Sequence, residues 1–135
     1  MAKFVLTDAS VTLNSVDLSD HVSSVTLEIT ADEIVTTAMG DTFQSRTGGL
    51  KDGTLSIEFQ QDFASSEVDA TLFPLLGTTT AFLVKPTSGS VSATNPSYAG
   101  SVLVNSHSPV ANGVGELATM SVSFPTSGTI TRATS

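Results

Sequence analysis

The sequence predicts an all-β protein, a small β-sandwich or barrel with one short flanking α-helix. Three observations favour this class. Apolar and polar residues alternate over several short segments, which is the period of a half-buried strand. Ser and Thr contribute 20 residues each, whereas charged residues make up only 13% of the chain. The length of 135 residues suits a single domain, residues 1–135, with a hydrophobic core of its own.

Three segments alternate most regularly, and we expect each to be a strand with one buried face. They are residues 22–30, 53–60 and 118–124. The expected buried faces are Val25, Leu27 and Ile29 in the first segment, Leu55, Ile57 and Phe59 in the second, and Ala118, Met120, Val122 and Phe124 in the third.

Further strands are expected elsewhere. Residues 81–85 and 98–105 are apolar on both faces, which favours burial on both sides. Residues 3–7 are expected to form an N-terminal strand, and residues 10–18 a hairpin. The turn of that hairpin is placed at Asn14-Ser15, because Asn tolerates the positive φ that a tight hairpin turn requires.

One short helix is expected after the second strand. Ser65-Ser66 offers an N-cap, and acidic residues follow in the first turn, where they complement the helix dipole. Pro74 and Gly77 end the helix after two or three turns. The apolar positions at helical spacing are Val68, Leu72, Phe73 and Leu76.

Residues 31–50 fit neither pattern and are expected to form a long irregular connection. A structureless loop of this length is uncommon inside a compact domain and is usually functional or disordered. Residues 86–96 are rich in Ser, Gly and Thr and are expected to form a second loop.

Composition excludes several classes of protein. The net charge of −8 leaves too few cations to hold nucleic acid through its phosphates. The absence of cysteine excludes a disulfide framework, thiolate metal sites and a cysteine nucleophile. No run approaches the roughly 18 apolar residues of a membrane span. The apolar core of residues 1–8 is too short for a secretory signal, so we expect a protein that is not exported by that route.

Glycine motifs give no convincing chemistry. Residues 113–118 match the dinucleotide fingerprint G-x-G-x-x-A, but the residues that follow resemble a strand and not the helix that the fingerprint needs. We expect a hairpin loop in which Asn112-Gly113 supplies positive φ. Residues 48–53 lack the G-K-[ST] of a phosphate loop and are expected to form a turn.

The two histidines, His21 and His107, are far apart in sequence. His21 lies near Asp17 and Asp20, so a weak metal site is conceivable, but a hydrogen-bonded surface histidine is favoured. We therefore assign no catalytic, cofactor-binding or metal-binding residue, and expect no enzymatic activity and no cofactor.

Several phrases, taken in order, carry a resemblance over nearly the whole chain. In this order they resemble the tail tube (major tail) proteins of long-tailed siphophages, particularly those that infect actinobacteria. The phrases are VDLSDHV at 16–22, TAMGD at 37–41, LKDG at 50–53, VDATLFPLLG at 68–77 and SATNPSY at 92–98.

The resemblance implies the phage tail tube fold with a long inter-subunit loop, assembled as stacked hexameric rings. Such a tube is the conduit for DNA ejection into the host. The implied partners are further copies of the chain, the tape measure protein, the tail terminator and the tail-tip proteins. The implied locations are the virion and, during assembly, the cytoplasm of the bacterial host.

The expected sites follow from this role, with about four strands per subunit in a shared barrel. Six chains carry 6 × −8 = −48 charges per ring, which repels phosphates, so DNA passes non-specifically without stable binding. No membrane contact is expected. The residues expected to line the lumen are Thr26, Glu28, Thr54, Ser56, Glu58, Thr119 and Ser121. The residues expected to contact the next ring are Asp32, Glu33, Ile34, Val35, Met39, Asp41, Phe43 and Arg46.

Three other readings remain open. The first is a capsid-decorating or tail-tip β-domain protein, which would form trimers or caps. The second is a carbohydrate-binding β-sandwich, which normally needs exposed aromatic residues, whereas this chain has 7 Phe, 1 Tyr and no Trp. The third is an enzyme, which is supported only by the weak match to the dinucleotide fingerprint at residues 113–118.

Overall fold

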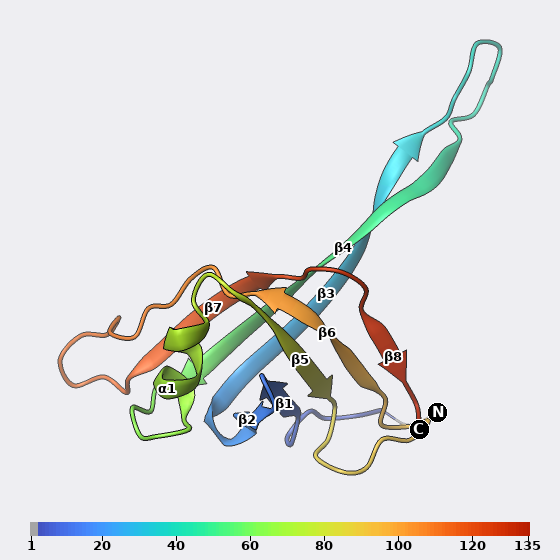
Figure 1. The fold of residues 1–135 in the computed structure, drawn as a ribbon. Helices are drawn as coiled ribbons and strands as arrows, with labels where there is room; N and C mark the ends of the chain where they lie inside the picture. Colours follow the sequence, from blue (N-terminus) through green and yellow to red (C-terminus); the bar gives the residue numbers. More distant parts are fainter. Residues whose placement is uncertain (1–2) are drawn as a thin grey trace.

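The computed structural model describes residues 3–135 and consists mainly of two antiparallel β-sheets (Figure 1). Within these residues, one sheet holds three strands in the order β3-β4-β7, and the other holds five in the order β2-β1-β5-β6-β8. The predicted all-β class is confirmed. The strands are β1 Ser10–Leu13, β2 Val16–Asp17, β3 Val22–Val35, β4 Arg46–Gln60, β5 Thr79–Lys85, β6 Ser97–Leu103, β7 Thr119–Pro125 and β8 Thr131–Ala133.

The hydrophobic core lies between the two sheets. The alternation predicted for β4 and β7 is confirmed, because their inward residues are buried and the residues between them are not. Ala118 is the exception, since it precedes β7 and is exposed. The buried apolar side chains are Leu55, Ile57, Phe59, Met120, Val122 and Phe124 from the three-stranded sheet, Val11, Leu13, Phe82, Val84 and Val102 from the other, and Leu18, Val68, Leu72 and Val104 around them.

The N-terminal hairpin forms where it was predicted, between β1 and β2. Asn14 and Ser15 make its turn with φ of 51° and 65°. The strand predicted over residues 3–7 is wrong. Phe4, Val5 and Leu6 are exposed and have no ladder partner among the described residues, so an apolar run that resembles a strand stays irregular.

The helical segment forms where it was predicted, with the predicted length of two to three turns. It comprises α1 Val68–Leu72 and a 3₁₀ turn, η2 Phe73–Leu75. Pro74 cannot donate the next helical hydrogen bond, and Gly77 leaves the segment with φ of +85°. The N-cap is Glu67 and not Ser65 or Ser66, and it makes no side-chain capping bond.

The irregular connection predicted over residues 31–50 is wrong for half of its length. Strand pairing between β3 and β4 continues to Val35 and Arg46, so only residues 36–45 are irregular. A β-bulge interrupts the ladder between Ala31 and Glu33, where Gly49 and Leu50 lie opposite Asp32. The result is a two-stranded ribbon, here called the hairpin arm (residues 31–51), that extends away from the body of the molecule (Figure 1).

Two smaller expectations also fail. Strands β5 and β6 bury one face in the core, but Ala81 and Leu103 on the other face are exposed in the single chain. Residues 104–118 are not a hairpin loop, because they connect β6 in one sheet to β7 in the other. The positive φ there belongs to Gly115 and not to Gly113.

Residues 86–96 form the predicted loop, pinned by the buried side chain of Asn95. Among residues 3–135, no helix is both long and apolar enough to cross a membrane.

Candidate functional site

The outer side of the three-stranded sheet is almost entirely polar. Strand register places Thr26, Ser56 and Ser123 in one row across the sheet, and Ser24, Glu58 and Ser121 in the next. All seven residues predicted to line a lumen lie together on this side. We call it the polar face, and define it as Ser24, Thr26, Glu28 and Thr30 of β3, Asp52, Thr54, Ser56, Glu58 and Gln60 of β4, and Thr119, Ser121 and Ser123 of β7.

Short side chains hydrogen-bond across the strands of the polar face. The hydroxyls of Ser56 and Ser123 are 3.2 Å apart, and the Ser121 hydroxyl donates to Glu58 Oε1 at 3.3 Å. A shallow depression in its centre is lined chiefly by these Ser, Thr and Glu side chains. The face carries three carboxylates and no base, so its charge is negative.

Both outer strands of this sheet are unpaired on one side within residues 3–135. Strand β3 pairs only with β4 on one side, and β7 pairs only with β4 on the other. An outer strand presents a row of free N–H and C=O groups that a strand of another chain can pair with.

The hairpin arm holds all eight residues predicted to contact a neighbouring ring. Glu33 and Arg46 form an ion pair across its strands, and Arg46 Nη2 also donates to Gln44 Oε1 at 2.6 Å. Ile34 lies over Gly49, since a Cβ there would be 2.9 Å from Ile34 Cδ1. These contacts hold the two strands together without a core beneath them.

The tip of the arm is a polar turn that carries two apolar side chains. Asp41 Oδ2 accepts from the backbone N–H of Ala38 at 2.8 Å, and Gly40 adopts φ of +93°. Met39 is fully exposed and Phe43 is 87% exposed. The turn is therefore internally bonded, whereas its apolar groups have nothing to pack against in the single chain.

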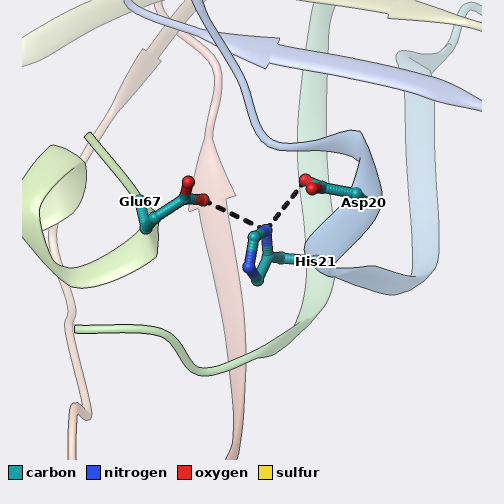
Figure 2. A group of neighbouring side chains, drawn as sticks. All are labelled: Asp20, His21 and Glu67. Atoms are coloured by element: carbon teal, nitrogen blue, oxygen red, sulfur yellow. Dashed lines mark hydrogen bonds and ion pairs between the residues drawn. The ribbon is translucent and has the colours of Figure 1, made fainter. Parts of the chain in front are cut away.

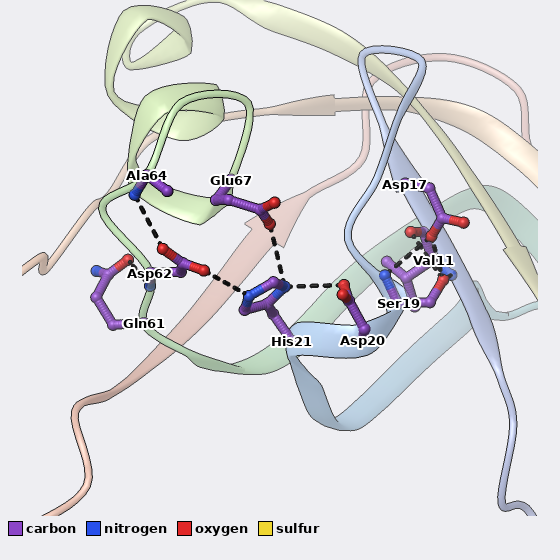
Figure 3. A network of polar contacts seen from close by, with 9 residues as sticks. All are labelled: Val11, Asp17, Ser19, Asp20, His21, Gln61, Asp62, Ala64 and Glu67. Atoms are coloured by element: carbon purple, nitrogen blue, oxygen red, sulfur yellow. Dashed lines mark hydrogen bonds and ion pairs between the residues drawn. The ribbon is translucent and has the colours of Figure 1, made fainter.

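A second polar cluster surrounds His21, which ends the 3₁₀ turn η1, Ser19–His21. Its Nδ1 lies 2.8 Å from Asp20 Oδ1 and 3.3 Å from Glu67 Oε2. Figure 2 shows how the two carboxylates face this nitrogen. Its Nε2 lies 2.9 Å from Asp62 Oδ2 (Figure 3). Three carboxylates thus converge on one imidazole and tie η1 to the segment between β4 and α1.

The pKa values of this cluster favour a protonated imidazole. Burial lowers the pKa of His21, but hydrogen bonds to Asp62 and Asp20 and the charges of Asp20 and Glu67 together raise it above 6.5. Two hydrogen bonds lower the pKa of Asp62 below 3.8. The bond from the Ala64 backbone N–H has the larger effect, and the bond from the His21 ring has the smaller one. An imidazolium that donates from both nitrogens satisfies this arrangement.

The predicted neighbours of His21 are partly right. Asp20 contacts the ring, but Asp17 instead accepts from the backbone N–H of Ser19 at 2.9 Å and from its hydroxyl (Figure 3). Both bonds lower the pKa of Asp17, and the bond from the Ser19 hydroxyl has the larger effect. Asp20, His21 and Glu67 place ligand atoms within 4.8 Å of one another, so these three could hold a metal ion only after the His21 ring has lost its second proton.

His107 makes a separate buried contact. Its Nε2 lies 2.9 Å from Asp69 Oδ1 and its ring is tilted against Phe73. This part-buried pair links the loop after β6 to α1, which points to a structural role.

Comparison with known proteins gives a likeness in structure alone. No protein-family profile and no curated protein matches the chain. A solved structure described as "Virion of native gene transfer agent (GTA) particle" contains a chain that superposes with a TM-score of 0.75. The match covers 93% of this chain and 95% of that chain, at 14% sequence identity. The chain shares the fold of a virion component. At this identity the likeness establishes the fold, and the function has to be argued from the surfaces described above.

Sequence reasoning missed two features of these surfaces. Asp62 and Glu67 reach His21 from more than 40 residues away, and no local spacing signals that contact. Strand register adds Ser24 and Ser123 to the polar face, in two neighbouring rows, although the alternation of β7 already places Ser123 opposite the core residues.

Proposed function

We propose that the protein is a structural virion protein, a tail tube subunit that polymerises as stacked hexameric rings and forms the conduit for DNA ejection. The observation that carries this proposal is a polar, carboxylate-bearing sheet face whose two outer strands each have one edge that is unpaired within residues 3–135. The hairpin arm and the fold shared with a chain of a virion particle support it.

Ring formation follows from the two outer strands. If β3 of one copy pairs with β7 of the next, the contact joins two different surfaces and closes into a ring when the rotation per copy allows. Each copy then contributes three strands to a shared barrel, in place of the about four expected from sequence. Eighteen strands at ~4.8 Å give a backbone diameter of roughly 34–39 Å at tilts of about 35–45°, wide enough for a DNA duplex.

The polar face becomes the lining of this barrel, because the opposite face of the sheet is buried in the core. Carboxylates and hydroxyls give no cationic site for phosphate, so DNA slides along the lining without stable binding. Thr119 lies at the end of the lining and is held by Asn112, whose amide contacts its hydroxyl and backbone N–H.

The remaining roles belong to this same assembly. The partners proposed for it are the tape measure protein, the tail terminator and the tail-tip proteins. The protein works in the virion after assembly in the bacterial cytoplasm, and its role is non-enzymatic.

Electron microscopy and sedimentation of the purified protein test the proposal. We expect six-fold rings and tubes at high protein concentration, or after addition of tail-initiation proteins. A variant with a shortened hairpin arm is the matched control, because it keeps both outer strands of the sheet. Trimers or caps would instead indicate a capsid-decorating or tail-tip protein, and a protein that stays monomeric with its initiation partners would contradict assembly altogether.

A further inference from the structure

An apolar groove opens between the two sheets along the inner side of β3. The buried face of β3 is incompletely covered, because Val25 and Leu27 are only partly buried and Ile29 is 49% exposed. The groove has a volume of about 420 Å³. Its other walls are Leu6 and Ala9 of the N-terminal segment, Val84, Lys85 and Pro86 at the end of β5, and Tyr98 of β6.

The tip of the hairpin arm has the complementary character. Met39 and Phe43 project from a turn that is already bonded internally, so ordering the tip upon contact costs little conformational entropy. Two exposed apolar side chains on one preformed turn can act as anchors when a partner offers a pocket that covers them.

Charge also matches between the two surfaces. Lys85 is the one charged residue among those that line the groove, and its Nζ donates to the carbonyl of Gly89. Asp41 is the one charged residue among positions 36–45 of the tip. A lysine at the groove and an aspartate at the tip favour a single orientation of docking.

The arm cannot fill the groove of its own chain. It extends away from the body by about 25–30 Å, estimated from the strand rise beyond Ala31, and Figure 1 shows its tip far from the termini and from the other strands of both sheets. A contact between tip and groove therefore joins two copies. Since the two surfaces differ, each copy offers one of each, and the contact propagates from copy to copy.

We propose that the groove is the receptor for the arm tip of a second copy of this chain. Met39 and Phe43 enter between β3 and the end of β5, and Asp41 faces Lys85. This inference rests on the proposed function, since it names the surface of the adjacent ring that the arm contacts.

The absence of cysteine allows a direct test by disulfide cross-linking. One preparation carries Phe43→Cys and another carries Ile29→Cys, both at exposed positions, so neither change removes a core side chain. The two are mixed, assembled and oxidised. A disulfide dimer that joins the two variants can form only between copies. The matched control replaces Ile29→Cys by Ser56→Cys on the polar face.

We expect the Phe43/Ile29 pair to cross-link with a yield about tenfold or more above that of the Phe43/Ser56 pair, because docking raises the effective concentration of the thiols. Lys85→Glu should lower that yield and Lys85→Arg should preserve it. Tubes that form without the Phe43/Ile29 cross-link would overturn this inference and leave the proposed function intact.

The two other outcomes are also informative. The cross-link in an oligomer that is not a tube would support the tip and groove contact and contradict the tail tube proposal. Neither tubes nor cross-link at high concentration, with the initiation proteins present, would overturn both.

Discussion

His21 Nε2 lies 2.9 Å from Asp62 Oδ2, and this contact joins the start of β3 to the segment that leaves β4. The two residues are 41 positions apart in sequence. With Asp20 and Glu67 on the other ring nitrogen, the imidazole lies between carboxylates from two segments, η1 and the connection from β4 to α1. The cluster therefore fixes the base of the three-stranded sheet from which the hairpin arm extends.

Stability should depend on pH through this cluster. Because the pKa of folded His21 is raised above 6.5, its contribution is fully present below about pH 6.5 and is lost as pH rises through the folded value. Because the pKa of Asp62 is lowered, its contribution is present above about pH 3.8 and is lost below. The pair therefore stabilises most between these limits.

Thermal unfolding of the wild type and His21→Gln checks this prediction. We expect the wild-type melting temperature to fall between pH 5.5 and 8.5 by more than that of His21→Gln. The control is Glu28→Gln, a carboxylate variant on the polar face, away from the cluster, which should keep the wild-type pH profile. A His21→Gln profile parallel to the wild type would show that the cluster does not titrate in this range.

The turn between β1 and β2 should be improved by glycine. Ser15 adopts φ of 65°, a conformation that costs a residue with a Cβ more than it costs glycine, and the preferred sequence of such turns is Asn-Gly. We expect Ser15→Gly to raise the free energy of unfolding by roughly 0.5–1 kcal/mol. Ser10→Gly, in strand β1, should lower it. Chemical denaturation measures both, and a loss of stability in Ser15→Gly equal to that in Ser10→Gly would contradict the turn assignment.

Charge reversal on the polar face should turn the proposed conduit into a DNA-binding one. Glu28→Lys with Glu58→Lys changes each chain from −8 to −4, and each ring from −48 to 6 × −4 = −24. We expect intact tubes that retain DNA at low salt and release it as salt rises. The control, Asp8→Lys with Glu116→Lys, has the same net charge but alters residues outside the polar face. Equal DNA retention by the two variants would mean that the polar face does not line the lumen.

Removal of the hairpin arm should affect assembly and not the stability of the monomer. Residues 31–48 are all exposed, so replacing 33–48 by a Gly-Ser turn takes nothing from the core. We expect an unchanged melting temperature and no tubes. A sharp drop in melting temperature would mean that the arm covers its own subunit.

Hydrogen exchange gives an independent measure of arm docking. The arm is held by a two-stranded ladder alone, so its amides should exchange quickly in the free chain and slowly in tubes, with the largest change over residues 36–45. Equal protection of residues 31–50 in both states would refute docking.

The sequence predicted the fold best where apolar and polar residues alternate regularly along a strand that has one face on the core. In β4 and β7 the alternation of Leu55, Ile57 and Phe59, and of Met120, Val122 and Phe124, reflects burial against the opposite sheet. The hairpin arm is also made of strands, but it has no buried face. Its sequence therefore shows no alternation of apolar and polar residues, and the segment was predicted to be irregular. Residues 3–7 show the converse, because an apolar pattern without a ladder partner does not make a strand.

The candidate site likewise has one part that the sequence predicted and one part that it did not. The polar face was predicted because its residues are the complement of the core positions on strands already identified. The His21 cluster, the groove beside β3 and the number of strands per sheet depend on how distant segments meet, which period and spacing do not contain. Asp62 and Glu67 near His21 are the clearest example, since each approaches from the far end of β4.

The unpaired edges of β3 and β7 have a consequence for the protein before it is assembled. A free ladder bonds through the peptide backbone, so it discriminates poorly between a correct neighbour and any other extended chain, and premature association is the hazard. Mutual repulsion between chains of charge −8 slows such encounters. Raising the ionic strength weakens this repulsion, because the screening length falls to about 3 Å at 1 M. Salt alone should therefore shorten the delay before the isolated chain polymerises or precipitates.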